Sequence, residues 1–155
     1  MEKNVNTFQI DVSSNKEIST KARDDAENKV MLIATDPLKE DVYLWKNTFD
    51  YHVVGVDNSH ESRSFLQHKD NLKMVSHVIS NPSFILEDQI HPTRKNYIGM
   101  VKLIMEDEVK AKHLHIVTDE STKIEGTFEI VTIRPQSRIS TNLNERVVIY
   151  DEFSN

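Results

Sequence analysis

The sequence contains no cysteine, and this absence removes several kinds of chemistry at once. Disulfide bonds, zinc sites built on thiolates and thiol nucleophiles are all excluded. Any metal site would therefore have to use His, Asp and Glu side chains.

Glycine is also scarce, with three residues in a chain of 155. The phosphate-binding loops G-x-G-x-x-G and G-x-x-x-x-G-K-[ST] cannot be written with Gly55, Gly99 and Gly126. The zinc motif His-Glu-x-x-His is missing too, because His60-Glu61 is followed by Ser64 where the motif needs its second histidine. We predict no cofactor and no metal.

Long apolar runs are absent as well, since none approaches the roughly 18 to 20 residues that cross a bilayer. The first residues also lack the apolar centre of a signal peptide, so we expect a cytoplasmic protein without a membrane partner. The formal net charge of −6 disfavours non-specific binding of nucleic acid over a broad surface. RNA binding would have to use a local basic cleft.

The patterns along the chain predict a flexible tail over residues 1–28 and a single α+β domain over residues 29–155. An apolar stripe with helical spacing predicts one principal helix over about residues 63–80, ended by Asn81-Pro82. A short helix is predicted near residues 37–46, because Asp36-Pro37 suits a helix start.

The remaining patterns are those of strands, and they predict a mainly antiparallel sheet on which the principal helix packs. The predicted strands are residues 30–34, 51–56, 83–86, 97–105, 113–118, 127–134 and 147–150.

The segment His91-Pro92-Thr93-Arg94-Lys95-Asn96-Tyr97 is a compact basic loop in an acidic chain. Metal-free cleavage of a phosphodiester needs an acid and a base, and a cation for the charge that develops on the phosphate. This loop supplies groups of those kinds. The alternative is a solvated turn with ordinary surface cations.

Two other patterns involve histidine. His68 lies inside the apolar stripe of the predicted helix, where it either packs in the core or presents an imidazole to a cleft. His77 lies on the opposite side of that helix and is predicted to face solvent. His113 and His115 share one face of a strand, and two half-exposed histidines are favoured there over a metal pair.

A resemblance to a known family rests on the order of several short patterns. Trp45 and His52 precede a histidine-bearing helix, which is followed by Val78-Ile79-Ser80-Asn81-Pro82-Ser83-Phe84-Ile85 and by the strands Leu114–Val117 and Phe128–Ile133. Over about residues 41–134 this succession resembles the phage-associated barnase/EndoU-like (BECR-type) nuclease families. The resemblance implies a small α+β RNase domain in which His52 or His68 is the family histidine and Thr132 ends the active edge of the sheet.

We therefore predict a metal-independent RNase-like domain of phage or mobile-element type, in which His52 or His68 acts as acid or base. Arg94, Lys95 and Tyr97 are expected to contact phosphate. The full predicted site comprises His52, His68, Arg94, Lys95, Tyr97 and Thr132.

The alternative function is a non-catalytic prophage or host module that binds a protein partner or inhibitor through its acidic surface. Convergence of His, Arg and Lys in one cleft would favour the enzyme. Scattered histidines beside an exposed apolar patch would favour the binding module.

Overall fold

A computed structural model describes residues 29–50, 65–136 and 147–154. Its centre is a seven-stranded sheet in the order β1-β2-β6-β5-β4-β3-β7, in which only β2 and β6 run parallel to each other. The strands are β1 (Val30–Thr35), β2 (Asp41–Trp45), β3 (Phe84–Glu87), β4 (Lys95–Met105), β5 (Glu108–Glu120), β6 (Phe128–Gln136) and β7 (Val148–Asp151). The predicted α+β class with a mainly antiparallel sheet is confirmed.

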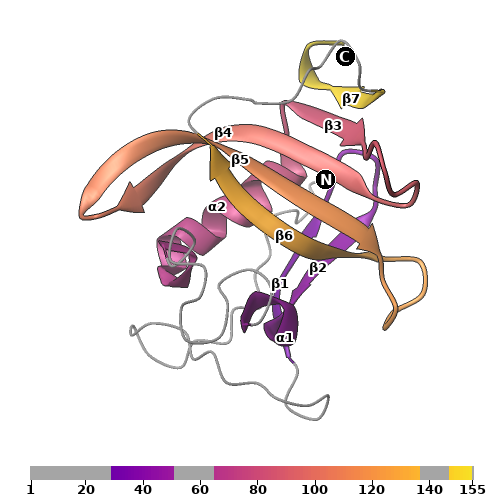
Figure 1. The fold of residues 1–155 in the computed structure, drawn as a ribbon, viewed down its shortest axis with the longest axis horizontal. Helices are drawn as coiled ribbons and strands as arrows, with labels where there is room; N and C mark the ends of the chain where they lie inside the picture. The colour runs from indigo at the N-terminus through magenta and orange to yellow at the C-terminus, as the bar shows by residue number, and fades with distance from the viewer. Residues whose placement is uncertain (1–28, 51–64, 137–146, 155) are drawn as a thin grey trace.

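The principal helix α2 (Lys69–Ser80) packs on one side of this sheet, against β4, β5 and β1 (Figure 1). Gly99 allows α2 to approach β4 closely, because a Cβ there would lie 3.3 Å from Cγ1 of Val78. Two further short segments are the helical turn α1 (Lys46–Thr48) and the 3-10 helix η5 (Glu152–Ser154).

The three longest strands, β4, β5 and β6, divide their side chains between two faces. The face toward α2 carries Tyr97, Leu114, Ile116 and Ile133, all fully buried in the hydrophobic core. The other side of the sheet, called the outer face below, receives the residues that alternate with these. His115 is one of them, and it pairs with Ile98 of β4 and Arg134 of β6.

The short helix predicted near residues 37–46 is wrong. Asp36 does cap the segment, but its Oδ1 atom accepts hydrogen bonds from the backbone N–H groups of Leu38 and Glu40, both at 2.9 Å, and so closes a turn. Lys39 has a φ of 73°, which a continuing α-helix does not allow. The chain then returns as β2, in which Val42 and Leu44 face the core with strand spacing.

The principal helix begins later than predicted, at Lys69 instead of about residue 63. Residues 65–67 form a 3-10 turn, and His68 is the N-cap. The Nδ1 atom of His68 accepts a hydrogen bond from the backbone N–H of Asp70 at 3.2 Å, and its side chain is exposed. The predicted end of the helix before Asn81-Pro82 is confirmed.

Two other expectations, the tail over residues 1–28 and the strand over residues 51–56, lie outside the described residues. Among the described residues, no helix is both long and apolar enough to cross a membrane.

A buried carboxylate ties the β1–β2 turn to β4 on the α2 side of the sheet. The hydroxyl of Tyr97 donates a hydrogen bond to Oδ2 of Asp36 at 2.6 Å, and the Lys95 ammonium lies 3.7 Å from the same oxygen. Lys95 also lies 4.0 Å above the centre of the Phe128 ring. Burial, reinforced by the Asp36 carboxylate, raises the pKa of the Tyr97 phenol far above its ordinary value.

Replacing Tyr97 by Phe should destabilise the protein by about 1–3 kcal/mol, because the buried Asp36 carboxylate loses a hydrogen-bond donor while the packing is kept. The free energy of unfolding from urea titration measures this loss. Tyr150→Phe is the control, because no hydrogen bond of the Tyr150 hydroxyl is found among the described residues. Equal stabilities of the two variants would show that the Asp36–Tyr97 contact contributes little.

Candidate active site

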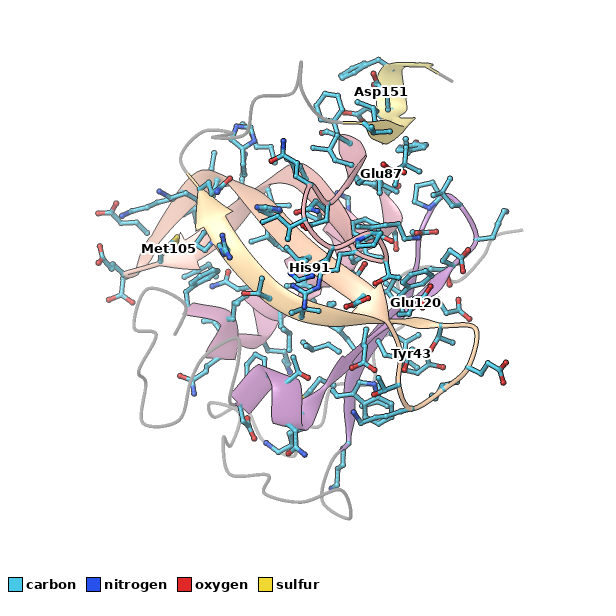
Figure 2. The ribbon with its side chains drawn as sticks, turned by 45° about the vertical axis from the view of Figure 1, so that its right-hand side comes forward. Tyr43, Glu87, His91, Met105, Glu120 and Asp151 are labelled. Atoms are coloured by element: carbon cyan, nitrogen blue, oxygen red, sulfur yellow. The ribbon has the colours of Figure 1, made fainter. Side chains whose placement is uncertain are left out.

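A pocket of about 280 Å³ lies on the outer face of the sheet, where the segment between β3 and β4 meets β5 and β6. We call it the outer pocket. Figure 2 shows His91, which belongs to that segment, near the middle of the long strands. The polar residues of interest in its lining are His91, Arg94, Asn96, His115, Thr132 and Arg134.

His115 is fixed by a hydrogen-bonded chain that starts at a carboxylate. The amide nitrogen of Asn96 donates to Oδ1 of Asp88 at 3.1 Å, so its amide oxygen faces Nε2 of His115 at 2.6 Å. This orientation of the amide requires the proton of His115 to be on Nε2. The side chain is 8% exposed, and its contact with Asn96 fixes the direction of the ring at the pocket wall.

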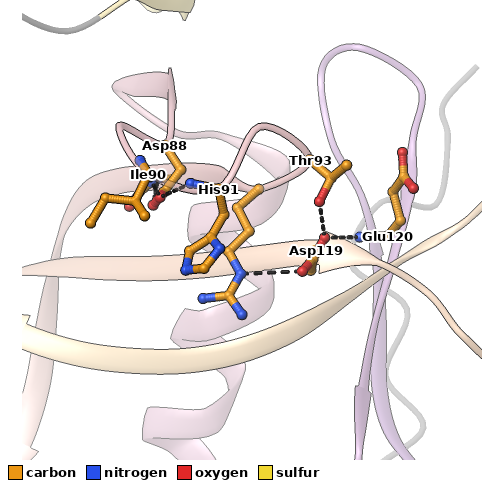
Figure 3. Close-up of polar contacts among 8 residues, drawn as sticks. Asp88, Ile90, His91, Thr93, Asp119 and Glu120 are labelled. Atoms are coloured by element: carbon orange, nitrogen blue, oxygen red, sulfur yellow. Dashed lines mark hydrogen bonds and ion pairs between the residues drawn. The ribbon is translucent and has the colours of Figure 1, made fainter.

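The segment that carries His91 is folded around Asp88. Oδ2 of Asp88 accepts the backbone N–H groups of Ile90 at 3.1 Å and of His91 at 3.0 Å (Figure 3). Burial alone would raise the pKa of Asp88, but the N–H groups of His91 and Ile90 and the amide of Asn96 outweigh it and lower the pKa to about 2. The carboxylate stays ionised and holds His91 at the rim of the pocket.

Arg94 is positioned by a second carboxylate, that of Asp119. Nε of Arg94 donates to Oδ2 of Asp119 at 3.1 Å, while Thr93 donates to Oδ1 at 2.6 Å (Figure 3). Burial works against ionisation of Asp119, but the Thr93 hydroxyl, the N–H of Glu120 and Arg94 together lower its pKa. A guanidinium has five N–H donors, so this contact leaves the terminal nitrogens of Arg94 able to bind an anion.

The β6 strand brings a hydroxyl and a second guanidinium to the same pocket. Thr132 pairs with Val117 and Arg134 pairs with His115 across the β5–β6 ladder, which puts their side chains on the outer face. Arg134 is exposed, and no ion pair of its side chain is found among the described residues.

The residues predicted from the sequence to form the site are divided by the sheet. Arg94 and Thr132 line the outer pocket, whereas Lys95 and Tyr97 contact Asp36 on the α2 side. His68 caps α2, and none of the described contacts joins it to the outer pocket. His52 lies outside the described residues. The predicted set is therefore not brought together within the described part of the chain.

The structure corrects the expectation for the exposure of His115. The prediction that it is half-exposed on a solvent face is wrong, because Asn96 and the segment between β3 and β4 cover it. Its neighbour on the same face, His113, is half-exposed as predicted, and His77 is exposed as predicted. The alternating histidines were the available signal, but a lone strand does not reveal which of the two will be covered.

The outer pocket thus combines two imidazoles, two guanidiniums and one hydroxyl with the Asp88 carboxylate and the amides of Gln89 and Asn96. Imidazoles transfer protons near neutral pH, and guanidiniums bind phosphate oxygens with paired N–H groups. Among the described residues, no group of three or more His, Asp and Glu side chains is arranged to hold a metal ion.

Comparison of the chain with family models, with curated proteins and with solved structures found no match. The resemblance to BECR-type nucleases therefore rests on the short sequence patterns alone.

Replacing Asp88 by Asn should weaken the segment that holds His91 in a pH-dependent way. The folded-state pKa of about 2 lies below the ordinary value of 3.8, so the ionised carboxylate stabilises the fold above pH 4 and loses this effect as the pH falls toward 2. The stability difference between parent and variant should be on the order of 1 kcal/mol at neutral pH.

The measurement is the free energy of unfolding of both proteins between neutral pH and about pH 2, where the difference should shrink. Glu125→Gln is the control, because Glu125 is exposed and no side-chain hydrogen bond of it is found in the described ranges. A parent–variant difference that stays constant with pH would contradict the role of Asp88.

Proposed function

We propose that the protein cleaves RNA phosphodiester bonds without a metal ion, in the outer pocket. The observation that carries the proposal is the meeting of His91 and His115 with Arg94 and Arg134 around one pocket. The residues differ in part from those expected from the sequence, but the reaction class is the same.

The reaction requires two proton transfers. One imidazole takes the proton from the 2′-hydroxyl, whose oxygen then attacks the phosphorus. The second imidazole donates a proton to the departing 5′-oxygen, which leaves a 2′,3′-cyclic phosphate and a 5′-hydroxyl as products. His91 and His115 are the candidates for these two roles.

Asn96 is a positioning residue in this proposal, because it holds His115 through Nε2 and is itself held by Asp88. A base or acid whose ring is fixed by a third group is the arrangement that general acid–base sites commonly use. Arg94 and Arg134 would stabilise the negative charge that develops on the phosphate oxygens during attack.

Local charge supports this reading despite the acidic chain. The Asp88 carboxylate in the pocket lining and the Asp119 carboxylate that binds Arg94 accept hydrogen bonds from the protein itself. Arg134 is exposed with no ion-pair partner among the described residues. A phosphate that enters the pocket therefore meets two guanidiniums, Arg94 and Arg134, and one ionised carboxylate, that of Asp88.

The test is cleavage of mixed-sequence RNA by the purified protein in the presence of EDTA. His91→Ala, His115→Ala and Arg134→Ala should each lower kcat/KM by about 10²-fold or more, since removal of a proton-transfer group or a charge-stabilising donor commonly costs that much. His113→Ala is the matched control, because it removes an imidazole two positions away on the same face of β5, outside the pocket lining. It should keep the parent rate.

Unfolding measured in parallel separates loss of rate from loss of structure, which matters most for the buried His115. Absence of cleavage above the level of the His91/His115/Arg134 triple variant would reject the nuclease proposal. The non-catalytic protein-binding module would then be the better account.

A further inference from the structure

A pair of aromatic rings lies on the outer face, on β2. Tyr43 and Trp45 alternate with the fully buried Val42 and Leu44, so their side chains point away from the core. Their ring centres are 6.0 Å apart and the ring planes differ by 14°, so the two rings lie nearly parallel. Both residues are half-exposed.

A cation lies over one ring of this pair. The ammonium of Lys123, from the loop between β5 and β6, lies 5.4 Å from the centre of the Trp45 ring. Lys123 is exposed, and its side chain makes no ion pair within the described ranges.

The neighbouring carboxylate, that of Glu129, accepts hydrogen bonds from the loop between β5 and β6. Glu129 pairs with Tyr43 across the β2–β6 ladder, and its Oε2 atom accepts the hydroxyl of Ser121 at 2.8 Å and the backbone N–H of Thr122 at 3.1 Å. The carboxylate thus shapes the loop that carries Lys123, and it does not pair with that cation.

The aromatic pair lies on the same face as the outer pocket. Tyr43 pairs with Glu129, and Glu129 pairs with Asp119, which binds Arg94 at the pocket. Thr132 follows Glu129 by three positions on β6, about 10 Å along a strand, and the register shift in the β5–β6 ladder between Val117 and Thr118 lets both lie on the outer face. Tyr43 and His91 can be located together in Figure 2.

We propose that Tyr43, Trp45 and Lys123 form a platform on which bases of single-stranded RNA stack while the backbone continues into the outer pocket. This proposal rests on the proposed function, because it takes RNA as the ligand. Sheet surfaces that bind single-stranded RNA commonly combine exposed aromatic rings with cations, because every base has a face that can stack. A duplex hides its base faces, so the platform selects single strands.

Trp45 provides a direct readout, because it is the only tryptophan of the chain. The probe is a short single-stranded 2′-O-methyl RNA, which lacks the free 2′-hydroxyl that cleavage requires. Binding to the full-length protein should quench Trp45 fluorescence. A duplex of the same sequence and inorganic polyphosphate should leave the fluorescence nearly unchanged.

Variants test which residues form the platform. Tyr43→Ala should weaken binding of the probe about tenfold or more, the loss expected for one stacked base. Lys123→Ala should weaken binding and reduce its dependence on salt. Tyr150→Ala is the matched control, because it removes a phenol from β7 at the far edge of the sheet and should bind like the parent.

The outcomes separate this inference from the proposed reaction. Quenching by single strands without any RNA cleavage would support the platform while rejecting the nuclease. Cleavage without quenching, with Tyr43→Ala unchanged in affinity, would overturn the platform and leave the nuclease intact. Equal quenching by polyphosphate would also overturn it, because stacking would then play no part.

Discussion

The arrangement of this protein depends on one constraint, the burial of alternate residues of β4, β5 and β6 beneath α2. Once Leu114, Ile116 and Ile133 face the helix, the strand period of two sends His115 and Arg134 to the outer face. A slip of one residue in register would bury the cations and expose the core. The hydrophobic core therefore determines where the polar residues of the candidate site converge.

On both faces of the sheet, carboxylates of this acidic chain hold turns and loops in place through hydrogen bonds within the protein. On the α2 side, Asp36 joins the β1–β2 turn to Tyr97. On the outer side, Asp88 and Asp119 hold the segment that carries His91 and Arg94, and each has a lowered pKa despite the opposing effect of burial. A net charge of −6 is thus compatible with a local phosphate site, because these carboxylates are turned toward partners within the protein.

The sequence predicted those features that depend on short-range patterns. The apolar stripe of α2, its end before Asn81-Pro82 and the strand character of β3 to β6 follow from periodicity and from proline chemistry. The helix expected near residues 37–46 failed because a cap residue such as Asp36 starts turns as readily as helices. The site was predicted only in part: β4 begins at Lys95, which sends Lys95 and Tyr97 away from Arg94, and the cover over His115 comes from a distant segment.

The proposed function requires phosphate to bind on the outer face and not on the α2 side. An NMR titration of the full-length protein with uridine 3′-phosphate tests it directly, with backbone and imidazole signals followed together. If phosphate binds in the outer pocket, the largest shifts should fall on His91, Arg94, His115 and Arg134, with little change at His68 or at Lys95. Shifts centred on His68 and Lys95, with the outer pocket unaffected, would contradict it.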